Sequence, residues 1–181
     1  MLENDAVLVI GTGHYYTAPV GTPYPTNLNA IPPLWVEIGH TSLESILSFA
    51  SEGGDQTVLG TLQSPSLRST RSPRSESFEI LLQQWDEASL KLYYGSNAIQ
   101  LPNGLLAAAA TPLPTTCAFL AVFEDGPVRF PVYAPKVEIY RAGDLEFSDT
   151  NSFTGLPLKI TPVSYGANAW TYAVGAVAAA A

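Results

Sequence analysis

Prolines and glycines interrupt this chain throughout, and they constrain its fold more than any other feature of the sequence. There are 15 prolines and 14 glycines among 181 residues. Such residues favour turns, so the chain is divided into short pieces that suit strands better than long helices. A hairpin, a helix and further strands follow one another without the strand–helix–strand alternation of a parallel nucleotide-binding sheet. We therefore expect a single, mainly antiparallel β domain over residues 1–181.

The segments TVLGTLQS and SFEILLQ alternate polar and apolar residues with the period of a β-strand. Such alternation places one face of a sheet against a core and the other against water. We expect an extended hairpin over 57–83, whose strands are joined by the proline-bearing loop 64–75. Its apolar face would consist of Phe78, Ile80 and Leu82. Its polar face would consist of Thr57, Thr61, Gln63, Ser77, Glu79 and Gln83.

The segment WDEASLKLYYG predicts a single main helix near 86–94. Asp86 is a good N-cap, and Glu87 places negative charge in the first turn, where it suits the helix dipole. Gly95 can close the C-terminal end. The buried stripe of the helix would come from Ala88, Leu92 and either Leu90 or Tyr94.

The remaining apolar runs predict five more strands. They cover residues 6–11, 117–124, 128–135, 136–142 and 156–165. The turn residues Asp125, Gly126 and Pro127 separate two of these strands. Together with the hairpin and the helix, they describe a β-sandwich with one flanking helix.

Two segments are too irregular to belong to the core. Residues 17–34 are rich in Pro, Gly, Thr and Asn, and so long a structureless segment is usually functional, so we expect an N-terminal arm that wraps a neighbouring molecule. Residues 166–181 form an Ala-rich tail, whose apolar stretch is about half the ~20 residues of a spanning helix. The N-terminus lacks the basic and apolar regions of a signal peptide. We expect no membrane partner.

The charge balance argues against nucleic-acid binding. The chain has 16 Asp and Glu residues against 8 Lys and Arg residues, a formal charge of −8, whereas non-specific binding depends on basic groups. Charged residues make up only 13% of the chain, below the roughly 25% of soluble domains, which suggests that other copies cover much of the surface. The dense basic cluster Arg68, Arg71 and Arg74 either lies in a solvated loop or meets acidic groups of an adjacent copy.

Motifs that would carry chemistry are incomplete in this chain. Gly11 and Gly13, after an apolar run, imitate the start of a dinucleotide fingerprint, but Tyr16 stands where the third glycine belongs and no helix pattern follows. His14 and His40 could each act as a base, because triads are defined by geometry. However, the chain has no Gly-x-Ser-x-Gly nucleophile elbow.

The surroundings of His40 suit an architectural role better. Thr41 and Glu44 have the spacing of a capping box, or the hydroxyls nearby satisfy backbone groups in a turn. Cys117 stands in an apolar run and is expected to be a buried small hydrophobe. With one cysteine and two histidines there is no zinc set, and GGDQT offers too few oxygen ligands for calcium. We expect no catalytic, cofactor-binding or metal-binding residue.

Six motifs occur in one order along nearly the whole chain, from about residue 3 to residue 165. They are YYTAPVGTPYPT, WVEIGHTSLES, GGDQTVLGTLQ, WDEASLKLYYGSNA, VYAPKVEIYRA and LPLKITPV. In this order they resemble the major tail proteins of long, non-contractile-tailed phages of actinobacteria. The chain departs from that pattern in the loop 64–75, in LLAAAATPLPTT and in the Ala-rich end.

The resemblance implies a tail tube subunit of the virion with a β-sandwich or half-barrel fold and no enzymatic activity. Six copies would close into a ring, and stacked rings, assembled in the host cytoplasm, would form the conduit for DNA ejection. Expected partners are further copies, the tape-measure protein and the tail-end proteins, while DNA passes without specific binding. The polar face of the hairpin would line the lumen. A ring would carry 6 × −8 = −48 formal charges, which discourages DNA from adhering.

Two other classes of protein remain possible from the sequence. A virion decoration or host-binding β-module would stay monomeric and show a sugar- or protein-binding groove. A small hydrolase would place His40 within hydrogen-bonding reach of a serine.

Overall fold

The computed structural model describes residues 7–147, 150–151 and 153–175, which form twelve strands and one α-helix. In chain order the elements are β1 (Thr12–Ala18), β2 (Val36–Glu37), β3 (Ser48–Gly53), β4 (Gln56–Leu59), β5 (Arg68–Arg71), β6 (Arg74–Leu82), α1 (Glu87–Tyr94), β7 (Ile99–Gln100), β8 (Leu106–Ala107), β9 (Thr115–Asp125), β10 (Val128–Arg141), β11 (Leu156–Pro162) and β12 (Ala173–Val174). The last six residues of the Ala-rich segment 166–181 lie outside the described residues. The expectation of a mainly β fold with one helix is confirmed.

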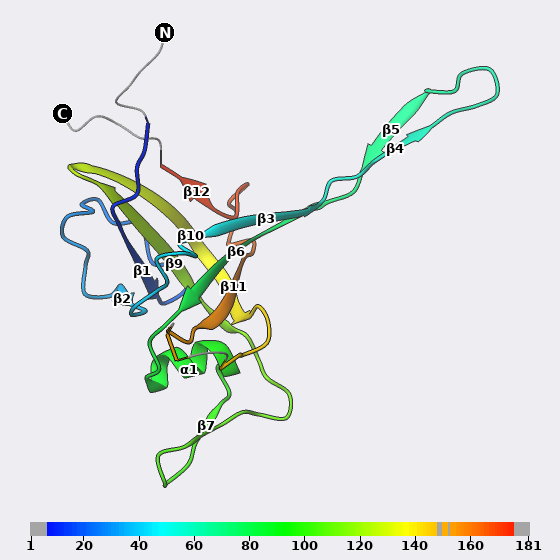
Figure 1. Cartoon of the computed structure of the whole chain (residues 1–181). Helices are drawn as coiled ribbons and strands as arrows, with labels where there is room; N and C mark the ends of the chain where they lie inside the picture. Colours follow the sequence, from blue (N-terminus) through cyan, green and yellow to red (C-terminus); the bar gives the residue numbers. More distant parts are fainter. Residues whose placement is uncertain (1–6, 148–149, 152, 176–181) are drawn as a thin grey trace.

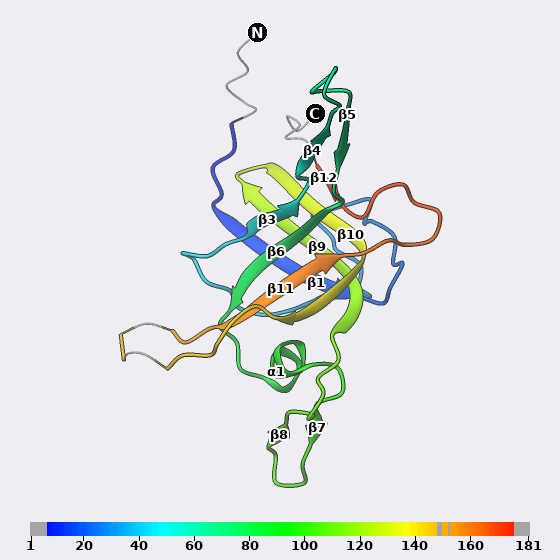
Figure 2. The same cartoon turned by 90° about the vertical axis from the view of Figure 1, so that its right-hand side faces the viewer.

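Eight of the strands form one antiparallel sheet that curls into a half-barrel. Its order is β2-β1-β9-β10-β11-β6-β3, and β12 pairs with β10 beside that path. The two ends of the curl are joined by residues 36–42, because Ile38 N–H donates to the Tyr15 carbonyl and Ser42 N–H to the Leu81 carbonyl, both at 2.9 Å. Figure 2 shows β6 and β11 facing β1 and β9 across the resulting interior.

The interior of the half-barrel holds the main core. Phe78, Ile80 and Leu82 on β6 are each at most 3% exposed, so the expected apolar face points inward. The Tyr15 ring from β1 meets Phe119 on β9, with ring centroids 6.4 Å apart. The remaining core comes from the inward side chains of β9, β10 and β11. Period-two alternation on several strands therefore builds one shared apolar interior.

A second apolar cluster lies on the outer face of β1, β9 and β10. Trp35 and Tyr133 meet there edge to face, with centroids 6.1 Å apart. The segment 17–34, expected to be an arm, begins in β1 and then crosses this cluster on its own subunit. Gly21 N–H donates to the Pro135 carbonyl at 2.9 Å. The Tyr133 hydroxyl donates to a backbone carbonyl of the same segment at 2.8 Å.

The helix begins and ends where its capping residues predict. The Asp86 carboxylate accepts the Ser89 N–H at 2.8 Å, and this bond holds the pKa of Asp86 below its usual range. The Gly95 N–H closes the last turn on Lys91. The expected stripe is wrong in part, because α1 packs on β10 and β11 through a face one residue further along. Its buried residues are Ser89, Leu92 and Tyr93, while Ala88 is exposed and Leu90 and Tyr94 are half-buried.

Two predictions of strands differ from the structure. The strand expected over 6–11 is wrong for residues 7–11, which precede β1 and belong to no strand, because the partner β9 ends at Asp125 and the ladder begins only at Thr12; residue 6 lies outside the described residues. The expected strands 128–135 and 136–142 are one long strand, β10, whose register shifts between Ala134 and Val137. Along one side β10 pairs with β9. On its other side it pairs with β12 before the shift and with β11 after it. The tight turn between β9 and β10 lies where it was expected.

The hairpin region has different strand partners from those expected. The two alternating segments do not pair with each other, because β6 pairs with β3 and β4 pairs with β5. Thr57 therefore lies opposite Thr70, and Ser77 lies opposite Ala50. Gly53 and Gly54, with φ of 82° and 75°, form the joint between the two sections. The outer section, Gln56–Arg71, projects from the body of the molecule (Figure 1), and we call it the distal hairpin.

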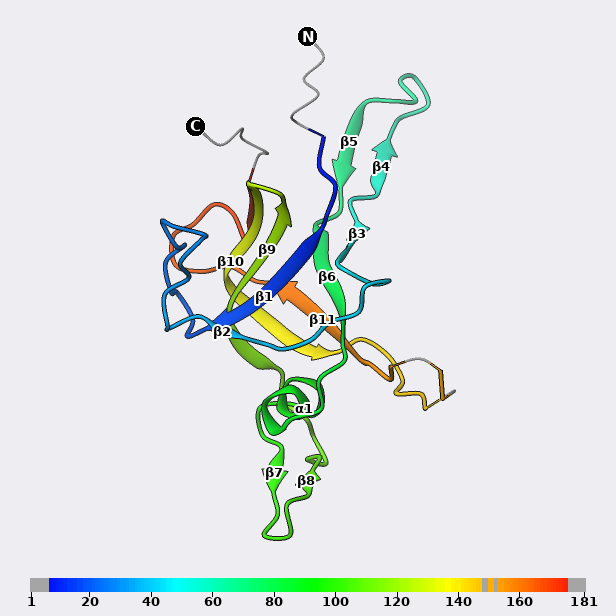
Figure 3. The same cartoon turned by 60° about the vertical axis from the view of Figure 1, so that its left-hand side comes forward.

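A second, smaller hairpin, β7–β8, projects beyond α1 at the opposite end of the half-barrel. Figures 1 and 3 show the distal hairpin and β7–β8 pointing away from each other, with the sheet between them. The molecule is therefore elongated, with one projection at each pole.

Candidate functional site

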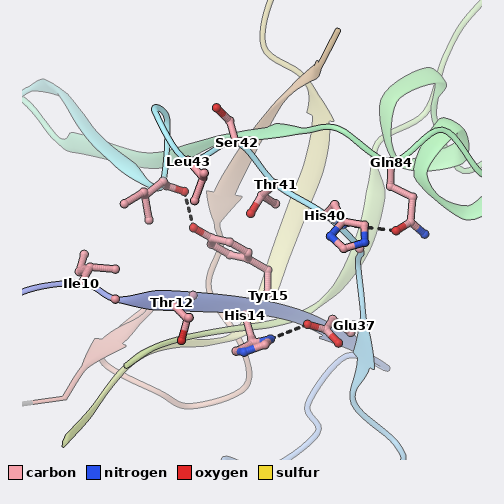
Figure 4. Close-up of a pocket in the computed structure, with 14 residues that line it drawn as sticks. Ile10, Thr12, His14, Tyr15, Glu37, His40, Thr41, Ser42, Leu43 and Gln84 are labelled. Atoms are coloured by element: carbon pink, nitrogen blue, oxygen red, sulfur yellow. Dashed lines mark hydrogen bonds and ion pairs between the residues drawn. The ribbon is translucent and has the colours of Figure 1, made fainter. Parts of the chain in front are cut away.

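The histidines lie at a hollow of about 730 Å³ between β1 and the connection 39–46 (Figure 4). The His14 ring Nδ1 lies 2.7 Å from the Glu37 carboxylate, and both side chains are about half exposed. His40 contributes its backbone: its N–H donates to the Gln84 side chain at 3.3 Å, and its carbonyl accepts the Gln83 N–H at 2.7 Å. The hydrogen bonds of His40 thus tie the connection to β6.

The hydroxyls beside His40 hold a turn. The Ser42 hydroxyl accepts the N–H groups of Glu44 and Ser45 at 3.2 and 3.4 Å. No helix follows in this part of the described chain, so of the two interpretations of Thr41–Glu44 the turn applies and the capping box does not. The Tyr15 hydroxyl donates to a carbonyl in the same connection, and burial raises the pKa of Tyr15. Among the described residues no serine hydroxyl hydrogen-bonds to either histidine ring.

Other reactive groups are equally unpromising for chemistry. Cys117 is 7% exposed, and burial raises the pKa of its thiol to about 12, which keeps the reactive thiolate scarce. Within the described ranges, no three His, Cys, Asp or Glu side chains lie close enough to share a metal ion. No helix of the described chain is long and apolar enough to cross a membrane.

The outer faces of β10, β11, β6 and β3 form a polar surface that we call the wall. Strand register places Tyr140, Lys159, Glu79 and Ser48 in one row across it. Opposite charges directly across an antiparallel pair attract, so Lys159 offsets part of the Glu79 charge. Sequence analysis missed Lys159, although it stands between the buried Leu158 and Ile160 in an alternating strand.

The six candidate lumen residues do not lie together. Ser77 and Glu79 lie on the outer face of β6, with Gln83 just past its end, and Ser77 is only 6% exposed. Thr57, Thr61 and Gln63 lie on the distal hairpin instead and are exposed. The structure thus brings together three of the six at the wall and the other three on the projection.

The three candidate contact arginines lie on strands, whereas a loop was expected over 64–75. Arg68 and Arg71 bound β5, and Arg74 begins β6. All three are exposed, and none has an ion-pair partner among the described residues. Leu62 at the tip of the distal hairpin is 94% exposed, and Leu67 is 66% exposed. So much apolar surface beside unpaired arginines is typical of a contact region.

Comparison with known proteins identifies one family. The family described as phage tail tube protein matches residues 1–176. Major tail protein Gp23 of Mycobacterium phage D29 is 35% identical over 175 residues, and its namesake from Mycobacterium phage L5 is 33% identical over the same length. Each alignment covers 89% of this chain and 87% of the relative.

Proposed function

The chain belongs to the phage tail tube protein family and is a structural component of the virion tail, and we propose that six copies close into a ring and that stacked rings form the conduit for DNA ejection. The match over nearly the whole chain, on an open half-barrel with exposed projections, carries this proposal. Its partners would be further copies, the tape-measure protein and the tail-end proteins. Assembly would take place in the host cytoplasm, and the protein would have no enzymatic activity.

The edge of the sheet supports self-association. Among the described residues β3 pairs only with β6, and five of its six residues are exposed. An unpaired edge offers a row of backbone donors and acceptors to another chain. In a ring, β3 of one subunit would pair with the opposite sheet edge of the next, which would make the walls of six subunits continuous.

The wall supports a role in lining the lumen. Its strands present polar side chains outward at Ser48, Glu79 and Lys159. The proposed lumen set keeps Thr57, Thr61, Gln63, Ser77, Glu79 and Gln83, with the first three lining the projection. An acidic ring of −48 formal charges would keep DNA hydrated and mobile inside.

The distal hairpin supports contact between copies. Arg68, Arg71 and Arg74 would meet carboxylates of an adjacent subunit, because their own chain provides no such partner among the described residues. Ordering this hairpin and the segment 17–34 would then depend partly on assembly.

Negative-stain electron microscopy of the purified protein tests the proposal. We expect rings or tubes with a central channel, which appear more readily as protein concentration rises. A substitution of Ser51→Lys on the exposed β3 edge should suppress them, since an edge lysine opposes strand addition. The matched control Ser69→Lys adds the same charge on β5 and should leave ring closure intact. Protein that stays monomeric at every concentration would instead favour a decoration or host-binding module.

A further inference from the structure

The distal hairpin differs in charge from the rest of the molecule. Residues 56–75, which are the distal hairpin and the four residues after it, contain three arginines and no carboxylate, so this segment carries +3 while the rest of the chain carries −11. Its tip presents Leu62 and Leu67, which are 94% and 66% exposed. A binding partner must therefore offer both an apolar surface and negative charge.

The opposite pole has a hollow with these two properties. It measures about 640 Å³ and lies between the end of α1, the segment that follows β8, and β10. Tyr93, Ala110, Leu113 and neighbouring alanines and prolines make most of its lining apolar. The chain from residue 92 to residue 123 has no charged side chain, so the apolar lining is continuous along this segment.

Negative charge borders the same hollow. Glu138 on β10 lines it directly. Asp144 lies nearby, because the adjacent Gly143 carbonyl accepts the Tyr93 hydroxyl at 3.0 Å. Neither carboxylate has an ion-pair partner within the described part of the chain, and Arg141 is the one basic residue in the lining.

The two surfaces face opposite directions. The distal hairpin lies at one pole, and α1 with β7–β8 lies at the other, in all three views (Figures 1 to 3). A contact between two different surfaces of identical subunits does not close on itself when the surfaces point along one axis, so it generates an open stack. The hollow near β1 lies on the flank of the half-barrel and does not meet this condition.

We propose that the tip of the distal hairpin of one subunit binds the hollow beside α1 of a subunit in the next ring. This inference rests on the proposed function and names the surface that receives the projection. Leu62 and Leu67 lie against Tyr93, Ala110 and Leu113, and the arginines of β5 face Glu138 and Asp144. Because Tyr140 belongs both to this hollow and to the row of the wall, the bound hairpin continues the polar wall from one ring into the next.

Disulfide cross-linking tests which surfaces meet. Leu62→Cys combined with Ala110→Cys should give a ladder of linked multimers when tubes are oxidised, because each subunit then bonds to two others. Leu62→Cys combined with Leu43→Cys is the matched control, since Leu43 is 89% exposed but lines the hollow near β1 and not the one beside α1. The native Cys117 is 7% exposed and does not interfere. Equal ladders from both pairs, or none from the first pair in well-formed tubes, would overturn the inference.

Charge reversal provides a second test that does not depend on disulfide geometry. Arg68→Glu should raise the protein concentration needed for tubes by about tenfold, because it removes a favourable charge contact and creates a repulsive one. Glu138→Arg in the same chain should recover most of that loss, whereas Glu124→Arg should not. Rings that form but never stack in the Arg68→Glu protein, with stacking recovered in the double variant, would also support the contact.

The two proposals fail in different ways. Parental protein that forms neither rings nor tubes would contradict the proposed function and this inference with it. Tubes that form normally from the Leu62→Asp protein would contradict the inference alone.

Discussion

The charge of the wall can be tested by replacing Glu79 with lysine. Glu79 is half-buried on the outer face of β6 and lies directly opposite Lys159 of β11. The net charge of each subunit rises by two, so the charge of a ring rises by 6 × 2 = 12, from −48 to −36. DNA phosphates would then pass a belt in which two lysines lie opposite each other on every subunit, where the parent has a glutamate opposite a lysine. Genome ejection should become slower, because each contact between lysine and phosphate must break before the duplex advances.

The substitution should leave the subunit folded. An opposite-charge cross-strand pair contributes roughly 0.2–1 kcal/mol and a like-charge pair costs a similar amount, so the total loss is about 2 kcal/mol at most. A domain of this size is stabilised by about 5–15 kcal/mol, and a lysine can extend its amine into water. Thermal unfolding and electron microscopy should therefore show folded subunits and intact tubes.

Ejection rates from otherwise parental particles, measured at several salt concentrations, complete the test. The delay should grow at low salt, because the screening length rises from about 8 Å at 0.15 M to about 30 Å at 0.01 M. Glu79→Gln should show a smaller delay, since it removes a charge without adding one. Glu146→Lys changes the net charge by the same amount on the exposed loop after β10 and should eject normally. Glu79→Lys particles that eject at the parental rate at every salt concentration would refute the placement of Glu79 in the lumen.

Three further predictions concern the subunit itself. Asp86→Ala should lower the free energy of unfolding by about 1 kcal/mol at neutral pH, as measured in urea. The folded-state pKa of Asp86 is depressed, so the stability that its carboxylate contributes is present above about pH 4 and is lost as the pH falls through the folded pKa. If Asp86→Ala still unfolds more easily than the parent in acid, the cap is contradicted. Native Cys117 should react with thiol reagents roughly a thousandfold more slowly than an ordinary thiol, and fast reaction without unfolding would show that β9 is open. Amide hydrogen exchange in 17–34 and 64–75 should slow on assembly, and equal protection before and after would show that these segments are already ordered in the subunit.

Local signals in the sequence predicted the elements that local interactions stabilise. Asp86 and Gly95 bound the helix through bonds to residues three or four positions away, so the boundaries could be inferred from the segment alone. The turn between β9 and β10 also depends on neighbouring residues, and its position was predicted correctly. The inward face of β6 followed from alternation because one side of that strand is fully buried.

The pairing of strands that are far apart in the sequence could not be inferred in the same way. The strand β3 has the sequence SFASEG and is exposed on both faces, so it carries no alternation that would reveal it as the partner of β6. The distal hairpin is likewise exposed on both faces, and its weak alternation was assigned to the wrong partner. Lys159 is 80 positions from Glu79 in the chain, and only the order of β11 and β6 in the sheet makes them neighbours.

The distribution of the eight basic residues determines how much positive charge the wall carries. Three lie in the distal hairpin or just after it, Lys91 and Arg129 pair with Glu87 and Glu124 at 2.6 and 3.0 Å, and Lys159 lies opposite Glu79. Only Lys136 and Arg141 remain without such a neighbour among the described residues. A subunit can therefore keep enough positive charge to attach to its own copies while offering almost none to phosphates. If the distal hairpin binds the next ring as proposed, assembly neutralises the two arginines of β5, and the finished tube repels DNA more uniformly than a single subunit does.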